Sequence, residues 1–180
     1  MTHQGSASTY ALLLQTARQA IQQYLDGDSL NVPAMEDALN QSRGVFVTLW
    51  EGQRKLRGCM GRTEGITPSL TQEVAECAIL AATRDPRFQP LTQATQLQEL
   101  SIELSLLMPL EPIVNESALD PQRYGVVVSA GKRRGLLLPN VDGIDTVREQ
   151  LHVACQKGKI DPDEPYALSR FEVLKISDEN

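Results

Sequence analysis

Aromatic residues and histidines are scarce in this chain. Phe, Trp and Tyr together make up 4% of the 180 residues, and there are only two histidines. Two histidines are too few for a His-rich metal centre, so zinc chemistry of that kind is not expected. In other respects the composition, 41% hydrophobic and 22% charged, is that of a soluble globular protein.

Paired cysteines, membrane-length apolar runs and positive net charge are also missing. The three cysteines, Cys59, Cys77 and Cys155, show no C-x-x-C spacing, which argues against a disulfide framework or a thiolate zinc site. No apolar run approaches the ~20 residues that span a bilayer, and Met1–Thr9 lacks the basic and apolar parts of a targeting segment. The net charge of −6 disfavours phosphate backbones and anionic lipid. We expect a cytoplasmic protein with no cofactor and no membrane partner, and the acidic balance disfavours a nucleic-acid partner.

A chain of this length can bury a core without metals or disulfides, so we expect one domain over residues 1–180. Leu13, Ala17 and Ile21 recur at helical spacing, and Gly27 follows, which predicts an N-terminal helix over about residues 8–25.

The region from residue 44 to 61 has the pattern of a β-hairpin. The run from Gly44 to Trp50 is β-branched and aromatic, and Gly52 suits a two-residue type II′ turn. That turn pairs Leu49 with Leu56 and Phe46 with Cys59. The core face then carries Val45, Val47, Leu49, Leu56 and Met60, and Arg57 and Cys59 lie together on the other face.

The same order of elements is expected twice. After the first hairpin come a helix that starts at Thr67-Pro68-Ser69 and a strand over residues 100–110. A second hairpin turns at Gly131-Lys132, and a helix from about Ile144 to Gly158 and a strand over 170–176 follow it. We infer an internal duplication, with a first repeat at about 44–110 and a second at about 124–176. The predicted fold class is α+β: duplicated hairpin-helix-strand repeats around a mainly antiparallel, barrel-like sheet with flanking helices.

The hexapeptide Leu56–Gly61 is the stretch that most resembles a site. It places Cys59 between Gly58 and Gly61 and between two arginines, Arg57 and Arg62. The arginines would favour the thiolate, which is the nucleophile and the soft-metal ligand. The glycines would leave the backbone beside the sulfur open to a ligand. The alternative is that Cys59 is a small residue that fills a tightly packed strand.

Partners for this thiol are few. Glu103, on the polar side of its strand, is a candidate base or a counter-ion to Arg57, or else a solvated surface carboxylate. His152 is expected at the polar margin of its helix. Arg87, Arg133 and Arg134 are candidates to join Arg57 in binding an anion, or to form salt bridges that hold the loop Asp85–Phe88 in place.

Several of these segments, in this order, resemble the AMMECR family over about residues 10–176. Its signature is similar to Leu-Arg-Gly-Cys-Ile-Gly, present here as residues 56–61 with Met60 in place of Ile. Further similarity lies in Gly44–Val47, Asp85–Phe88, Leu106–Leu110, Gly131–Pro139 and Cys155–Gly158. The resemblance implies a single α+β fold with duplicated repeats around a barrel-like antiparallel sheet, and it implies no particular reaction.

Prokaryotic members of that family are component A of the Amme-Memo-RadiSam set. The resemblance therefore implies association with a Memo-like protein and a radical SAM protein, although this chain has no C-x-x-x-C-x-x-C cluster motif of its own. Two functions follow as hypotheses. One is a thiol-dependent enzyme, or enzyme component, that acts on a small anionic or metal-bearing substrate in a pocket around Cys59. The other is a non-catalytic adaptor or binding module for these two partners. A nucleic-acid role is a third hypothesis, which the acidic balance argues against.

Overall fold

The computed structural model describes residues 6–36 and 38–178. Residues 1–5, 37 and 179–180, which include His3, lie outside this description. The chain divides into two compact units: unit 1 comprises Met1–Leu106 and Leu174–Asn180, and unit 2 comprises Leu107–Val173. None of the described helices is both long enough and apolar enough to cross a membrane.

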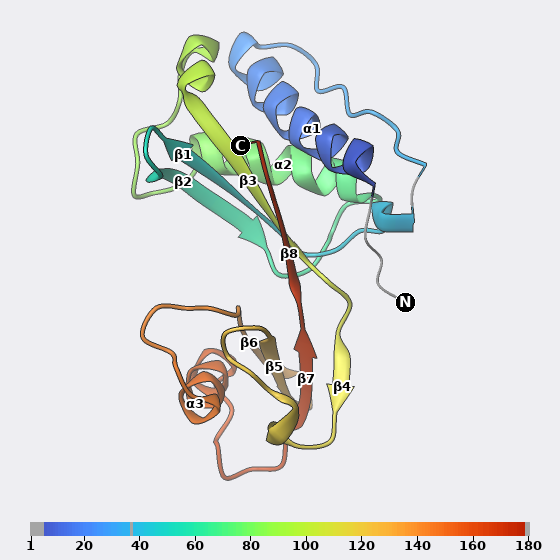
Figure 1. The fold of residues 1–180 in the computed structure, drawn as a ribbon, viewed down its shortest axis with the longest axis vertical. Helices are drawn as coiled ribbons and strands as arrows, with labels where there is room; N and C mark the ends of the chain where they lie inside the picture. The colour runs from blue at the N-terminus through green and yellow to red at the C-terminus, as the bar shows by residue number, and fades with distance from the viewer. Residues whose placement is uncertain (1–5, 37, 179–180) are drawn as a thin grey trace. The chain divides into compact units, whose positions relative to one another are not determined.

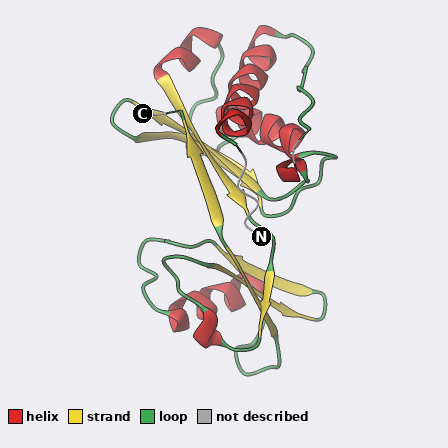
Figure 2. Ribbon diagram, turned by 45° about the vertical axis from the view of Figure 1, so that its right-hand side comes forward, coloured by secondary structure: helices red, strands yellow, loops and turns green. Residues whose placement is uncertain are grey.

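Unit 1 is a four-stranded sheet with its helices on one face (Figures 1 and 2). Its long helices are α1 (Ala7–Asp26) and α2 (Leu70–Thr83). Its strands, in the order β2-β1-β3-β8, are β1 (Val45–Glu51), β2 (Lys55–Arg62), β3 (Leu100–Leu107) and β8 (Val173–Ser177). Two short 3-10 helices, η1 (Ala38–Asn40) and η2 (Ala94–Glu99), complete it.

The predicted N-terminal helix is confirmed, and its ends have clear causes. The Ser6 side chain accepts a hydrogen bond from the Thr9 N–H at the start. Gly27, at φ 77°, ends the helix, and its N–H bonds to the Gln23 and Tyr24 carbonyls. The apolar stripe that includes Leu13, Ala17 and Ile21 is fully buried in the unit 1 core.

Unit 2 repeats this plan on a smaller scale. Its sheet has the order β4-β7-β5-β6, from β4 (Glu111–Ile113), β5 (Gly125–Ala130), β6 (Arg133–Leu137) and β7 (Ala167–Phe171). The helix α3 (Val147–Gly158) packs on β5 and β6, and the short helix η3 spans Glu116–Ala118. α3 begins later than the sequence suggested, because Thr146 caps it in a reciprocal pair with Glu149.

The two repeats exchange their last strands. The element order β1-β2-α2-β3 in unit 1 corresponds to β5-β6-α3-β7 in unit 2. In the first sheet β1 lies between β2 and β3, and in the second sheet β5 lies between β6 and β7. The strand that follows the first repeat, β4, then pairs with β7, and the strand that follows the second repeat, β8, pairs with β3. The duplicated hairpin-helix-strand order is thus confirmed. The sheet is not a closed barrel, because the strands form two separate four-stranded sheets.

The prediction of one strand over residues 170–176 is wrong. The chain forms β7 and β8 there, in different sheets, with Glu172 between them. The proline-containing link after β3 likewise holds a strand, β4. The strands β4 and β8 each complete the sheet of the other repeat. The alternation of residues along one segment does not reveal such long-range pairing.

The first hairpin keeps its predicted facing for Cys59 in a different register. Its loop has three residues, with Glu51 opposite Lys55, and a one-residue bulge follows, with Trp50 opposite Leu56 and Leu49 opposite Gly58. The two shifts add to two residues, an even number, so Cys59 still points away from the core face. Its partner is Thr48 and not Phe46, which lies opposite Gly61. Leu56 lies between the shifts, so it falls opposite Trp50 and outside the core cluster, contrary to expectation.

Candidate functional site

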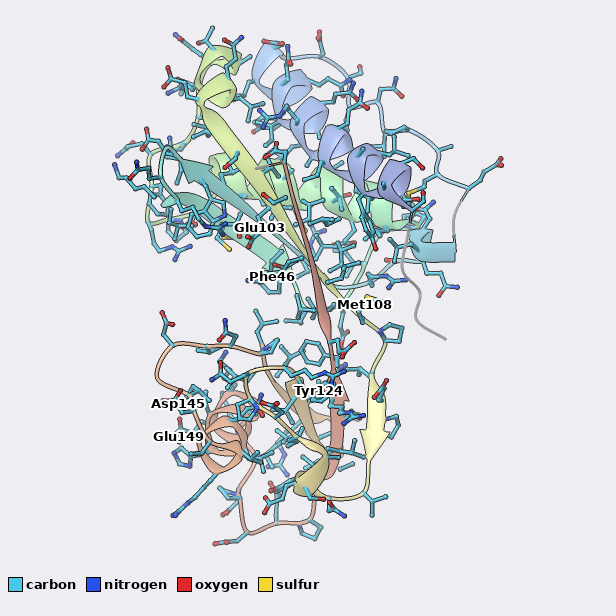
Figure 3. All side chains as sticks on the ribbon, in the orientation of Figure 1. Phe46, Glu103, Met108, Tyr124, Asp145 and Glu149 are labelled. Atoms are coloured by element: carbon cyan, nitrogen blue, oxygen red, sulfur yellow. The ribbon has the colours of Figure 1, made fainter. Side chains whose placement is uncertain are left out.

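The site face is the face of the unit 1 sheet that α2 does not cover. On β1 the residues Val45, Val47 and Leu49 are fully buried and belong to the unit 1 core, and α2 contacts this strand. Phe46, Thr48 and Trp50 alternate with them and therefore point to the other side. We call this side the Cys59 face. Figure 3 labels two of its members, Phe46 and Glu103.

Cys59 is the most accessible of the three thiols. Its residue is partly exposed, whereas Cys77 and Cys155 are buried. Burial raises the pKa of the Cys77 thiol to about 12 and also raises the pKa of Cys155, so these two remain neutral thiols. The Thr48 hydroxyl donates a hydrogen bond to the Cys59 sulfur, with 3.3 Å between Oγ1 and Sγ. A hydroxyl donor in this position stabilises a thiolate when one forms.

The backbone of Cys59 is held from outside the sheet by the loop that follows α2. The Cys59 N–H donates to Oδ2 of Asp85 at 2.8 Å, and the Arg87 guanidinium donates to the Cys59 carbonyl at 3.4 Å. Arg87 also binds Asp85 through two nitrogens, at 3.0 and 2.7 Å. We call these two residues the Asp85–Arg87 clamp. It satisfies the edge of β2 as a neighbouring strand would, and it fixes the peptide unit that carries the thiol.

The electrostatics of the clamp favour its ionised form. The hydrogen-bonded Arg87 guanidinium, with help from the Cys59 and Arg87 peptide N–H groups, holds the pKa of Asp85 well below its usual range. Asp85 is 6% exposed, so this carboxylate is shielded from solvent. The sequence left two roles open for Arg87, anion binding and a salt bridge that holds its loop in place. The geometry supports the salt bridge. Sequence reasoning did not assign Asp85 to the site.

Close packing explains why positions 58 and 61 are glycine. A Cβ on Gly58 would collide with the Ala81 carbonyl of α2, and a Cβ on Gly61 would collide with the Val45 carbonyl and the backbone of Phe46. Glycine at these positions lets the helix and the neighbouring strand approach β2 closely. Gly58 is covered by α2, so a ligand would not reach the backbone from that side.

The two arginines that flank Cys59 in sequence do not flank its sulfur. Arg57 is the extra residue of the bulge, and its guanidinium donates to the Gln89 carbonyl at 2.8 Å. Arg62 lies opposite Val45, on the helix side, where it forms ion pairs with Glu73 at 2.6 Å and Glu76 at 3.0 Å. The expectation that Arg62 favours a Cys59 thiolate is therefore not supported, because the sheet lies between them.

Glu103 lies across β1 from Cys59. Its ion-pair partners are not Arg57, as the sequence suggested, but Arg54 and Lys175. Thr48 pairs with Cys59 on one side and with Glu103 on the other. The Glu103 carboxylate is bound by Arg54 at 2.8 Å and by Lys175 of β8 at 3.7 Å. Arg54 also stacks over the Trp50 ring, 4.8 Å from its centroid. The counter-ion of Glu103 is thus Arg54, a residue that comes from the hairpin loop and that sequence reasoning missed.

The remaining candidates lie in unit 2. Arg133 binds the Glu164 carboxylate through two nitrogens, both at 2.7 Å, and donates to the Lys159 carbonyl. Arg134 follows it on β6 and is exposed. His152 is exposed on α3 and bonds to Gln156, which matches its expected place at the polar margin. Each unit is described by itself, so convergence of Arg133 and Arg134 with Arg57 stays a prediction.

The chemistry available at the Cys59 face is that of one positioned thiol. Among the described residues, the side-chain bond to its sulfur comes from the Thr48 hydroxyl, and no histidine or carboxylate bonds to it. No group of three or more His, Cys, Asp or Glu side chains suited to a metal ion occurs in residues 6–36 and 38–178. Arg87 lies at the carbonyl of Cys59. Arg54 and Lys175 pair with Glu103 on the same face of the sheet.

Comparison with known proteins places these features in a family. The AMMECR1 family model matches residues 14–176. A Thermotoga maritima protein is 42% identical over 139 residues, which cover 77% of this chain and 79% of the relative. A Clostridium acetobutylicum protein is 36% identical over 90% of this chain, and this chain spans only 35% of that longer relative. The crystal structure of an uncharacterized protein from Pyrococcus horikoshii has a TM-score of 0.72 and 32% identity, over 93% of this chain and 90% of that one.

Proposed function

This chain belongs to the AMMECR1 family, and we propose that it acts through Cys59 as a thiol-dependent cytoplasmic enzyme, or enzyme component, on a small anionic or metal-bearing substrate. The proposal rests on the exposure and the position of Cys59. Of the three cysteines it is the one that is partly exposed. The Asp85–Arg87 clamp binds both its N–H and its carbonyl. The clamp bonds the backbone of Cys59, and by fixing this peptide unit it also fixes the direction in which the thiol projects. A thiol that meets a substrate gains from it, because catalysis depends on fixed geometry.

The neighbours of Cys59 support roles in binding more than in proton transfer. Thr48 orients the Cys59 sulfur by its hydrogen bond. Glu103 holds Arg54 and Lys175 at the site by ion pairs, and these cations favour an anionic substrate. In this assignment Glu103 is a positioning residue for the cations, since its carboxylate binds Arg54 and Lys175 and not the thiol. Arg87 keeps part of its guanidinium exposed beside the Cys59 carbonyl and offers a further donor.

The test is differential alkylation. Native protein and protein unfolded in urea are treated with iodoacetamide at neutral pH, and the three cysteines are quantified by mass spectrometry. We expect Cys59 to be labelled in the native protein, with Cys77 and Cys155 labelled only after unfolding. A native Cys59 that stays unlabelled would count decisively against a reactive thiol. Cys59→Ser, with Cys155→Ser as the matched control, then separates loss of function at the site from a general effect of losing a thiol.

A second candidate function is a non-catalytic adaptor for a Memo-like protein and a radical SAM protein. The observation in its favour is that the Clostridium relative carries a region similar to this chain within a much longer protein. A domain that occurs joined to other segments in one relative is suited to work beside a partner in another. Full cellular function of Cys59→Ser, together with loss of partner binding by Arg57→Ala, would favour the adaptor over the enzyme.

A further inference from the structure

Unit 2 contains a groove along α3, distinct from the Cys59 face of unit 1, whose lining includes the core residues Leu151 and Cys155. It has a volume of about 870 Å³ and is lined by residues of η3, α3 and the segment before β7: Glu116, Thr146, Val147, Arg148, Glu149, Leu151, His152, Cys155, Pro162 and Tyr166. Figure 3 labels Glu149, in the first turn of α3. The volume falls within the range of about 300–1,000 Å³ that is usual for small-molecule sites.

Part of the groove lining is apolar. Val147, Leu151 and Cys155 follow at intervals of four on α3, so they form one stripe along the helix. The Cys155 thiol is neutral, because burial raises its pKa. The ring of Tyr166 and the ring of Pro162 complete the lining. Surfaces of this kind accept the face of an aromatic ring.

One rim of the groove carries donors that the described chain does not use. Arg148 is exposed, and its guanidinium makes no hydrogen bond or ion pair with any residue in 6–36 or 38–178. His152 lies one turn further along α3 and bonds through Nε2 to Gln156, which leaves its Nδ1 available. The Glu149 carboxylate is turned to the start of α3, where it accepts from Asp145 N, Thr146 N and the Thr146 hydroxyl at 3.1, 2.9 and 2.8 Å, and it forms no ion pair with Arg148 or His152.

Two lining residues outside α3, Glu116 and Tyr166, indicate which part of the groove suits the charged group of a ligand. Glu116 makes no side-chain bond with the described residues and would repel an anion placed beside it. The Tyr166 hydroxyl also lacks a partner among them, and burial raises its pKa, so it remains a neutral donor. An anionic group is therefore stable at the Arg148 and His152 rim, and an apolar ring is stable between α3 and Tyr166.

We propose that this groove binds a small organic anion with an aromatic body, whose carboxylate or sulfonate lies at Arg148 and His152 and whose ring lies against Tyr166 and Pro162. The proposal is independent of the function of Cys59. It concerns residues of unit 2 alone, and it holds whether the chain is an enzyme or an adaptor.

The test uses 8-anilinonaphthalene-1-sulfonate, an aromatic sulfonate whose fluorescence rises in apolar sites, titrated with the full chain. We expect saturable binding that Arg148→Glu weakens at least tenfold. The matched control is Arg84→Glu, since Arg84 is another exposed arginine without a side-chain partner among the described residues but lies in unit 1. Arg84→Glu should leave the affinity within twofold of the parent protein.

Two further measurements keep the outcome decisive. Tyr166→Ala should also weaken binding, and added salt should weaken it in the parent protein but not in Arg148→Glu, because only the parent pairs the sulfonate with a cation. Urea unfolding of each variant checks that it is folded, and Arg148→Gln replaces Arg148→Glu if the charge reversal destabilises α3. Absence of saturable binding, or equal affinity in the Arg148 and Arg84 variants, would overturn the proposal.

Discussion

Asp85 accepts a hydrogen bond from the peptide N–H of Cys59 at 2.8 Å. The two residues are 26 positions apart, and the bond joins a buried carboxylate to the backbone of an edge strand. Because the thiol and this peptide belong to one residue, any change at Asp85 reaches the thiol through its own backbone. The bond thus links the stability of unit 1 to the geometry of the candidate site.

Removal of the Asp85 carboxylate should cost stability. Asp85→Ala leaves the Cys59 N–H without its acceptor and Arg87 without its counter-ion, and an unmet buried donor costs about 1–3 kcal/mol. We expect a fall of that size in the free energy of unfolding, measured in urea, and faster hydrogen exchange at the Cys59 amide. Glu99→Ala, at an exposed carboxylate, serves as the control. Unchanged exchange at Cys59 would show that the clamp does not hold this peptide.

Stability should also fall in acid, and part of that fall should depend on Asp85. Its pKa in the folded chain lies below its value in the unfolded chain, about 3.9. The unfolded state therefore binds the proton first as the pH drops, so the stabilisation is present above about pH 4 and is lost as the pH falls further. Urea unfolding at pH 7, 4 and 3 should show this loss, and Asp85→Asn should show a shallower one. Parallel curves for the two proteins would contradict the assignment.

The hydroxyl of Thr48 should control the reactivity of Cys59. Thr48→Val removes the donor to the sulfur and keeps the shape, and a hydrogen bond of this kind is worth about 0.5–1.5 kcal/mol. We expect iodoacetamide to label Cys59 roughly 2- to 10-fold more slowly at pH 7. Thr48→Ser keeps the hydroxyl and should restore most of the rate. A Val variant as fast as the parent protein would exclude a role for this bond.

Two glycines should prove equally intolerant of a side chain. Gly58 on β2 lies against the Ala81 carbonyl of α2, and Gly135 on β6 lies against the Ala154 carbonyl of α3. Gly58→Ala and Gly135→Ala should each destabilise the protein by about 1–3 kcal/mol or more, because backbone must move to admit the methyl group. Gly52→Ala is the comparison: its Cβ meets open space, and only the left-handed φ of 52° opposes it. Thermal unfolding that ranks Gly52→Ala as the most harmful would refute this reading.

The exchanged strands predict that the chain can be cut without losing its assembly. Fragments 1–119 and 120–180 each contain one repeat, yet β4 belongs to the sheet of the second and β8 to the sheet of the first. Mixed or co-expressed fragments should form a 1:1 complex, detectable by size-exclusion chromatography with light scattering. A second fragment shortened to 120–172 lacks β8 and should bind more weakly. Two fragments that fold separately and ignore each other would show that strand exchange contributes little.

The facing of Cys59 was predictable because a strand alternates with period two. The expected two-residue turn was wrong, and so was the expected register, but the longer loop and the bulge displaced the strand by an even number. Leu56 was predicted to face the core, and this was wrong. It lies between the loop and the bulge, where the register is displaced by one residue, so it is paired with Trp50. The duplication extends to two glycines, Gly58 and Gly135, which occupy matching places under α2 and α3.

Local periodicity, turn residues and capping in the sequence determined the helices, the two hairpins and the duplicated order of elements, but not the strand β4 or the division of the last segment into β7 and β8. They also pointed to Cys59 as the residue to test. Only the tertiary structure decided which side chains surround that residue. Asp85, Arg54 and Lys175 reach the Cys59 face or its backbone from a loop, a hairpin turn and the exchanged strand β8. Arg62, only three positions from Cys59 in the sequence, lies on the helix side of the sheet. Such neighbours are set by the packing of distant segments, which no local pattern encodes, and they decide how Cys59 is positioned.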